Sequence, residues 1–109
     1  MTVTKVRLAR VEDVSAGYLQ RFETPAGALV LACGEEGASA VWDVCPHAGG
    51  RLSEGRVSGN RLRCPRHGYL FDLSTGICSR GEEEGFGSLS SVDMKQEDGY
   101  FVVELSKRS

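Results

Sequence analysis

Two short segments of this chain each place a cysteine and a histidine close together around a proline. The first segment reads Cys45-Pro46-His47, and after sixteen further residues the second segment reads Cys64-Pro65-Arg66-His67. Each segment offers one thiolate and one imidazole, and its proline restricts the backbone near the two donors. The chain contains only two histidines, and both follow a Cys-Pro pair. This pattern indicates a shared metal centre rather than four unrelated residues.

Two kinds of metal site use two thiolates and two imidazoles. A structural zinc site does so, but it usually pairs cysteine with cysteine and histidine with histidine. Here both segments are mixed, and one residue separates Cys45 from His47. A [2Fe–2S] cluster with two histidines on one iron has this ligand set, and its reduction potential lies between roughly −150 and +300 mV. The spacing therefore favours an iron–sulfur cluster, with a zinc-stabilised binding module as the alternative.

Length, charge and hydropathy limit the class of protein. The 109 residues suit one domain spanning 1–109. The formal net charge of −2 lacks the basic excess of a nucleic-acid-binding domain. No apolar run approaches the ~20 residues that cross a bilayer, and the first residues lack the apolar segment of a secretion signal. We therefore expect a soluble, cytoplasmic domain with reduced cysteines and neither nucleic-acid nor membrane partners.

Short strands separated by glycine-containing turns make up the predicted secondary structure. Alternating or continuous apolar residues predict the strands, and Gly, Pro, Asn and Asp mark the turns between them. The expected strands cover 3–10, 18–23, 28–33, 39–44, a hairpin at 56–62, and then 69–73, 77–79, 89–94 and 100–105. Three consecutive glutamates between glycines predict a mobile, solvated loop at 80–87. The fold class is therefore all-β.

The chain resembles a known family over the stretch from Cys45 to Gly76. This stretch reads CPHAGGRLSEGRVSGNRLRCPRHGYLFDLSTG and is similar to the cluster-binding signature of Rieske-type ferredoxins. The resemblance implies one [2Fe–2S] cluster per chain. It implies that Cys45 and Cys64 hold a buried iron, and that His47 and His67 hold an outer iron near the surface.

The same resemblance implies a fold and a function. The Rieske fold stacks antiparallel sheets, with a small cluster-binding subdomain at about 44–80 and a basal β domain formed by the remainder. Such ferredoxins carry electrons from a flavin-containing reductase to a terminal oxygenase and are not themselves enzymes. We expect a monomer that docks transiently through the tip bearing His47 and His67. The alternative in this fold is the small subunit of a nitrite reductase, with the cluster as a permanent relay.

This chain differs from the high-potential Rieske proteins of respiratory complexes at four positions, and the differences predict a lower reduction potential. Those proteins have a further cysteine in each ligand segment, where this chain has Gly50 and Arg66. They also have serine and tyrosine hydroxyls after the second histidine, where this chain has Tyr69 and Phe71. Fewer hydrogen bonds to the cluster stabilise its reduced state less. We therefore expect a potential at the low end of the Rieske range, nearer ~−150 mV than +300 mV.

Two charged groups allow a functional and a purely structural interpretation. Four arginines near the ligands either form a docking patch for an acidic partner, which we favour, or only solvate the surface; they are Arg51, Arg61, Arg63 and Arg66. The glutamates of the segment Glu82–Glu84 either guide a basic partner or form a solvated loop without a role.

Four apolar or weakly polar residues have mainly structural interpretations. We expect Cys33 and Cys78 to be small apolar strand residues rather than a disulfide or additional ligands. Trp42 is expected to be a core aromatic residue beneath the cluster rather than a residue on the electron path. Leu52 and Leu62 are expected to contribute packing only.

Overall fold

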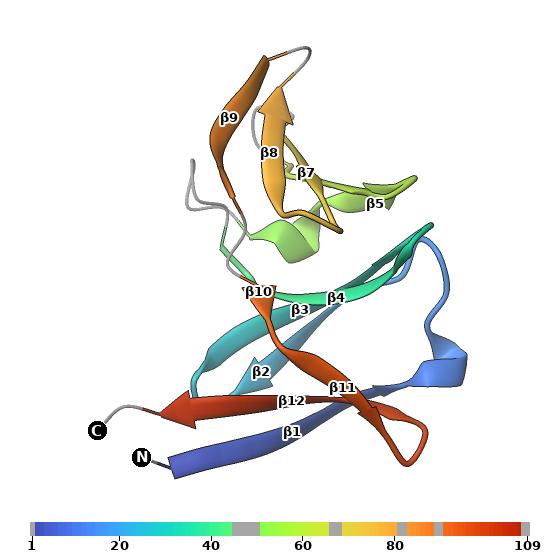
Figure 1. Cartoon of the computed structure of the whole chain (residues 1–109), viewed down its shortest axis with the longest axis vertical. Coiled ribbons are helices and arrows are strands. Elements are labelled where there is room, and N and C mark those ends of the chain that lie inside the picture. The colour runs from blue at the N-terminus through green and yellow to red at the C-terminus, as the bar shows by residue number, and fades with distance from the viewer. Residues whose placement is uncertain (1, 45–50, 66–68, 81–82, 89–90, 108–109) are drawn as a thin grey trace.

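Most of the described backbone lies in three antiparallel β-sheets (Figure 1). The computed structural model describes residues 2–44, 51–65, 69–80, 83–88 and 91–107. Within these ranges the helical elements are two three-residue 3₁₀ helices, η1 (Val11–Asp13) and η2 (Leu52–Glu54). Neither has the length or the apolar character that a membrane-crossing helix needs. The prediction of an all-β fold is confirmed.

The middle sheet consists of a three-stranded meander and one later strand. Its strand order is β10-β4-β3-β2, and its strands are β2 (Leu19–Thr24), β3 (Gly27–Gly34), β4 (Gly37–Trp42) and β10 (Ser91–Val92). Gly27 (φ 131°) and Gly37 (φ 134°) begin β3 and β4 in backbone conformations that favour glycine. The meander predicted over 18–44 is confirmed, with strand ends shifted by one or two residues.

The terminal sheet pairs the first strand of the chain with the last. Its order is β1-β12-β11, and its strands are β1 (Thr2–Arg10), β11 (Met94–Glu97) and β12 (Tyr100–Lys107). The hairpin between β11 and β12 turns at Asp98 (φ 52°) and Gly99 (φ 81°). Positive φ at both central residues is what a type I′ turn requires, and Asp-Gly supplies it. The turn predicted at this pair is confirmed.

The single strand predicted over 89–94 is wrong. Within the described residues, β10 pairs with β4 of the middle sheet, whereas β11 begins at Met94 and pairs with β12 of the terminal sheet. Asp93 lies between the two strands, so the chain passes from one sheet to the other there. Strand periodicity continues across this crossing, and periodicity alone therefore does not reveal it.

The outer sheet contains five short strands in sequence order. They are β5 (Arg56–Ser58), β6 (Arg61–Arg63), β7 (Leu70–Asp72), β8 (Ile77–Arg80) and β9 (Glu83–Ser88). The loop predicted at 80–87 is wrong for Arg80, which ends β8, and for 83–87, which lie in β9. Glutamate and glycine are depleted in strands, but β9 is an outermost strand of the sheet, where charged residues are common.

The middle sheet lies between the other two sheets, so β3 is buried on both faces (Figure 1). Val30 packs into a core shared with Leu62 and Phe71 of the outer sheet. Its neighbour Leu29 packs into a second core with Val103 of the terminal sheet. A strand buried on both faces reads as a continuous apolar run, as β3 does. The expectation of stacked antiparallel sheets is confirmed.

Trp42 lies in a different core from the one expected. It is partly buried and packs against the core that contains Leu29, Ala40 and Val103, between the middle and terminal sheets. Cys64 belongs to the other core, between the middle and outer sheets. Because successive side chains on a strand alternate between faces, it is Val41 that packs on the Cys64 side. The prediction of an aromatic residue beneath the cluster is therefore wrong.

The structural interpretations of Leu52, Leu62 and Cys33 are confirmed. Both leucines are completely buried. Cys33 is buried on β3, forms no disulfide among the described residues, and points its thiol at the carbonyl oxygen of Gly34 (3.5 Å). Cys78 lies on β8 opposite Phe71, and the state of its side chain remains a prediction.

Asn60 joins the outer sheet to the middle sheet. Its side-chain amide donates hydrogen bonds to the Glu36 carboxylate (2.8 Å) and the Ser74 hydroxyl (2.7 Å). Its side-chain carbonyl accepts from the Glu36 backbone N–H (3.2 Å), and its backbone carbonyl accepts from Leu73 (2.9 Å). Gly34 packs so closely against Asn60 that an added Cβ would overlap it. The Asn60 side chain in the β5–β6 turn therefore contacts both the β3–β4 turn and the turn after β7.

We expect Asn60→Ala to destabilise the protein by about 1–2 kcal/mol, because three side-chain hydrogen bonds are lost and polar groups of Glu36 are left without these partners. Urea unfolding followed by circular dichroism measures the change. Ser58→Ala is the matched control, since Ser58 is exposed on the same hairpin. Equal unfolding midpoints for the two variants would show that Asn60 does not hold the sheets together.

Candidate metal centre

Cys64 is the one predicted ligand that falls within the described residues. It follows β6 directly and is completely buried. Cys45, His47 and His67 lie in the ranges 45–50 and 66–68, outside the described residues. Their convergence with Cys64 on one centre therefore remains a prediction.

The second segment begins and ends at paired backbone. The Cys64 N–H donates to the carbonyl of Tyr69 (2.8 Å), immediately beyond the pairing of Arg63 in β6 with Leu70 in β7. Cys64 is thereby held at the end of a two-stranded ladder, with its neighbours in the core being Leu62 and Phe71. This backbone hydrogen bond and the packing around Cys64 hold the residue in place.

A completely buried cysteine beside apolar side chains suits a soft metal centre. Burial in apolar surroundings disfavours the thiolate unless a cation compensates its charge. A ferric or ferrous ion supplies that compensation, and thiolate is the ligand that iron–sulfur clusters take. The position of Cys64 therefore fits the role of a ligand to a buried iron.

The carboxylate of Asp43 connects the two sides of the first segment. Asp43 precedes residues 45–50 and Ser53 follows them. Asp43 Oδ1 accepts a hydrogen bond from the Ser53 N–H (2.8 Å), and Oδ2 accepts one from the Ser53 hydroxyl (2.7 Å). Because both groups of Ser53 bind one carboxylate, the chain entering the first segment is fixed against the chain leaving it.

Arg21 compensates the charge of the Asp43 carboxylate. Arg21 Nη1 lies 2.9 Å from Asp43 Oδ2, and the side chain of Asp43 is 0% exposed. A buried carboxylate is costly unless it is paired and hydrogen-bonded, and here it has an arginine and two donors from Ser53. The arrangement links β2, the end of β4 and η2 at the entrance to the first segment.

The part of the chain that follows the first segment also contacts the part that precedes the second segment. Gly55 follows η2, and an added Cβ there would overlap the carbonyl oxygen of Arg63, the residue before Cys64. Leu52 of η2 packs in the same core as Cys64. The chain leaving the first segment therefore lies against the chain entering the second. This closeness is what two segments that share a metal centre need.

The hydrogen bonds of Asp43 to Arg21 and Ser53 were not predicted from the sequence. The available signal was an acidic residue at the end of an apolar strand, directly before Val44 and Cys45. A charge at the end of a buried strand requires a partner. The sequence does not reveal that this partner is Arg21, because the contact spans 22 positions of the chain.

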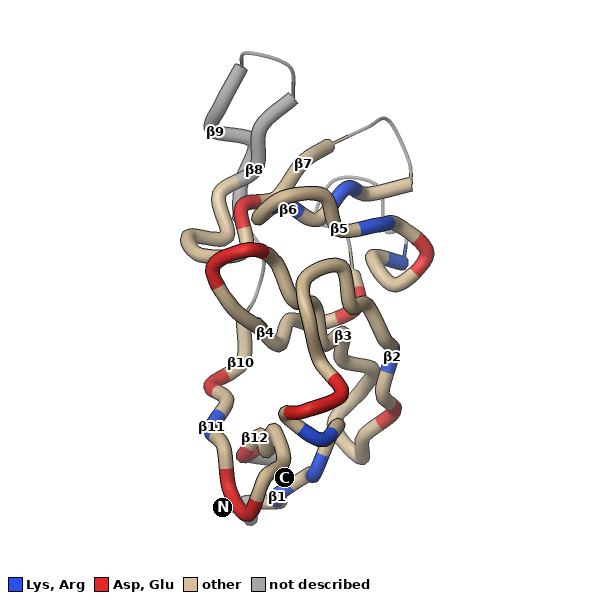
Figure 2. Tube along the Cα trace, turned by 90° about the vertical axis from the view of Figure 1, so that its right-hand side faces the viewer, with Lys and Arg blue, Asp and Glu red and all other residues tan. Residues whose placement is uncertain are grey.

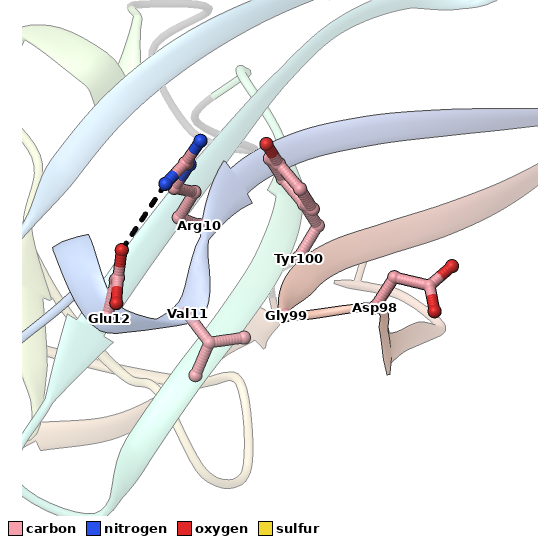
Figure 3. Close-up of a pocket in the computed structure, with 6 residues that line it drawn as sticks. All are labelled: Arg10, Val11, Glu12, Asp98, Gly99 and Tyr100. Atoms are coloured by element: carbon pink, nitrogen blue, oxygen red, sulfur yellow. Dashed lines mark hydrogen bonds and ion pairs between the residues drawn. The ribbon is translucent and has the colours of Figure 1, made fainter.

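One hollow on the described surface lies away from Cys64. It is about 530 Å³ in volume and is lined by residues of β1, η1 and the β11–β12 turn, with Arg10, Glu12 and Tyr100 among them (Figure 3). Arg10 there already pairs with Glu12 (3.4 Å) and faces the Tyr100 ring (5.6 Å from the centroid). These elements belong to the terminal sheet, at the opposite end of the molecule from the outer sheet (Figure 1). The hollow therefore plays no part in the candidate centre.

Comparison with known proteins identifies one family. The family model of the Rieske [2Fe-2S] domain matches residues 4–91. Apoptosis-inducing factor 3 of Homo sapiens is 31% identical over 102 residues, covering 94% of this chain and 16% of that protein. The ferredoxin component of the naphthalene 1,2-dioxygenase system of Pseudomonas putida is 29% identical over 108 residues, covering 97% of this chain and 100% of that protein. The chain thus spans a small part of the first relative and the whole of the second.

Solved structures show the same fold. Sphingomonas yanoikuyae B1 ferredoxin superposes with a TM-score of 0.80 at 23% identity, covering 94% of this chain and 100% of that one. The ferredoxin of carbazole 1,9a-dioxygenase from Nocardioides aromaticivorans IC177 superposes with a TM-score of 0.77 at 20% identity, covering 92% and 96%. At these identities the likeness concerns the arrangement of the strands.

We expect Asp43→Asn to destabilise the protein by about 3 kcal/mol, because it removes the buried charge that Arg21 pairs with. The variant should also bind less iron per chain, since the two sides of the first segment are held less firmly. Chemical denaturation and iron analysis measure the two effects. Glu23→Gln is the matched control: Glu23 also contacts Arg21 (3.3 Å), but its side chain is 82% exposed, so little change is expected. Equal stability and iron content in both variants would contradict this role of Asp43.

Proposed function

Because the chain belongs to the Rieske [2Fe–2S] domain family, we propose that it is a one-electron carrier between a flavin-containing reductase and a terminal oxygenase. Its cofactor is one [2Fe–2S] cluster, which takes up and releases single electrons when bound. The observation that carries the proposal is the match along the whole length of a ferredoxin component of a dioxygenase system. The chain itself carries no substrate chemistry in this proposal.

The proposed ligands are the four residues of the two segments. Cys45 and Cys64 bind one iron, and the complete burial of Cys64 supports its assignment to an inner position. His47 and His67 bind the other iron. The contacts of Asp43 with Ser53 and of Cys64 with Tyr69 support this assignment, since they hold the chain on both sides of these segments in place.

The partners and the location follow from the carrier role. A carrier must release each partner after one electron has passed, which favours small and transient interfaces. We propose docking at the tip that bears His47 and His67, and a monomer that moves between partners in the cytoplasm. We propose one domain of 1–109 with a cluster-binding part at about 44–80. The position of the β5–β9 sheet at one end of the molecule supports this proposal (Figure 1).

The purified protein should contain about two iron atoms and two acid-labile sulfides per chain, and it should give an EPR signal on reduction. Cys64→Ser should lose most of the iron, because a buried thiolate ligand is removed. Cys33→Ser is the matched control: Cys33 is also buried but lies on β3, and iron should be retained. A colourless wild-type protein that contains zinc would contradict the proposal. So would a Cys64→Ser variant with full iron content.

The reduction potential should lie at the low end of the Rieske range, nearer ~−150 mV than +300 mV. The physical reason is that Phe71, which is completely buried, has no hydroxyl group to stabilise a reduced cluster. Protein-film voltammetry measures the potential. A clearly positive value would contradict the expectation.

A further inference from the structure

Three exposed arginines share the outer surface of the β5–β6 hairpin. Arg56, Arg61 and Arg63 alternate with Val57 and Leu62, which pack on the core. Antiparallel pairing places Arg56 directly opposite Arg63. Among the described residues, none of the three forms an ion pair. We call Arg56, Arg61 and Arg63 the arginine face.

Some basic side chains in the other two sheets have acidic partners. Lys5 lies 3.1 Å from a Glu97 oxygen, and Arg21 binds Asp43. Asp72 is paired with Arg61 across β6 and β7, but its Oδ1 accepts hydrogen bonds from the backbone N–H groups of the following turn at 2.8 and 3.1 Å. Two carboxylates, those of Asp72 and Glu54, lie near the arginine face. Among the described residues neither forms an ion pair with it, and the three arginines outnumber them.

Stability does not explain this arrangement. Like charges directly opposite each other on paired strands are destabilising, and Arg56 and Arg63 are such a pair. Charged residues on an outermost strand prevent edge-to-edge association, which accounts for Arg56 on β5. It does not account for Arg61 and Arg63, because β6 is paired on both sides.

Positive charge is concentrated around the arginine face, and two hollows lie beside it. Residues 51–63 contain four arginines and one glutamate, although the whole chain has a formal net charge of −2. In Figure 2 basic segments gather around β5 and β6. One hollow of about 360 Å³ is lined by Glu54, Arg56, Arg63 and Pro65 among others, and a second of about 360 Å³ by Arg61 and its neighbours.

We propose that the arginine face is a docking surface for an acidic patch on the electron-transfer partner of this chain. The inference rests on the proposed carrier function. Guanidinium groups bind carboxylates through two parallel hydrogen bonds, and a concentrated positive field speeds encounter with an acidic protein. Arg63 and Pro65 flank Cys64 in the sequence, so a partner on this face lies beside the candidate centre. Arg56, which was not predicted for the patch, belongs to it, whereas Arg66 lies outside the described residues.

The test compares the holoprotein with the triple variant Arg56→Gln, Arg61→Gln, Arg63→Gln. Its affinity for the reductase and for the oxygenase of its own organism is measured by calorimetry at about 20 mM and about 300 mM NaCl, since salt screens charges over this range. We expect wild-type binding to one partner to weaken with salt. The triple variant should bind that partner about tenfold more weakly at low salt and lose most of the salt dependence.

The matched control is the triple variant Lys5→Gln, Arg10→Gln, Lys95→Gln, which removes the same charge from the terminal sheet. It should bind like wild type. Oxidation of the reduced holoprotein by ferricyanide, an anion, and by hexaammineruthenium(III), a cation, gives a partner-free readout. The arginine variant should slow the first reaction and speed the second, while its unfolding temperature should stay equal or rise because Arg56 and Arg63 no longer repel each other.

The outcomes separate the two proposals. Unchanged affinity in the arginine variant, or an equal loss in the control variant, would overturn the docking surface and leave the carrier function in place. A wild-type holoprotein that binds neither partner and exchanges no electron with them would overturn both. A loss of affinity that is accompanied by loss of the cluster absorbance would assign the arginines to folding and overturn the docking surface.

Discussion

The carboxylate of Asp43 holds together the chain on both sides of the first Cys-His segment, and the candidate centre depends on this contact. Nine residues, 44–52, lie between Asp43 and Ser53 in the sequence. Fixing both sides of a short segment lowers the conformational entropy that the segment loses when it binds a metal. Arg21 makes the burial of the carboxylate tolerable. The Asp43–Arg21 ion pair thus supports both ends of the first segment of the candidate centre.

Some contacts of the fold stabilise it, whereas the exposed surface of β5 and β6 does not. β3 is buried on both faces and joins two cores, and Asn60 attaches the outer sheet to the middle one. These contacts are satisfied and stabilise the fold. The outer surface of β5 and β6 instead carries like charges opposite each other. The repulsion between these arginines lowers the stability of the fold. A carrier that binds an acidic partner would retain them, because they attract that partner to the surface beside Cys64.

Local patterns predicted much of the fold and the family to which the chain belongs. The spacing of cysteine and histidine in two short segments depends on neighbouring residues only, and so do the Asp98-Gly99 turn and the meander of β2 to β4. The remaining features depend on contacts between distant residues. The pairing of Asp43 with Arg21, the switch of sheets at Asp93 and the position of Trp42 all follow from how the sheets stack. The β9 strand was missed because its composition is poor for a strand, whereas its pairing with β8 is what forms it.

We propose that two thiolates and two imidazoles from the two segments bind one [2Fe–2S] cluster. Pulsed EPR of the reduced protein tests it most directly, because it detects nitrogen nuclei bonded to the paramagnetic cluster. We expect two strongly coupled nitrogens in the wild-type protein. His67→Ala protein that still contains a cluster should show one. A cluster signal without strongly coupled nitrogen would contradict it.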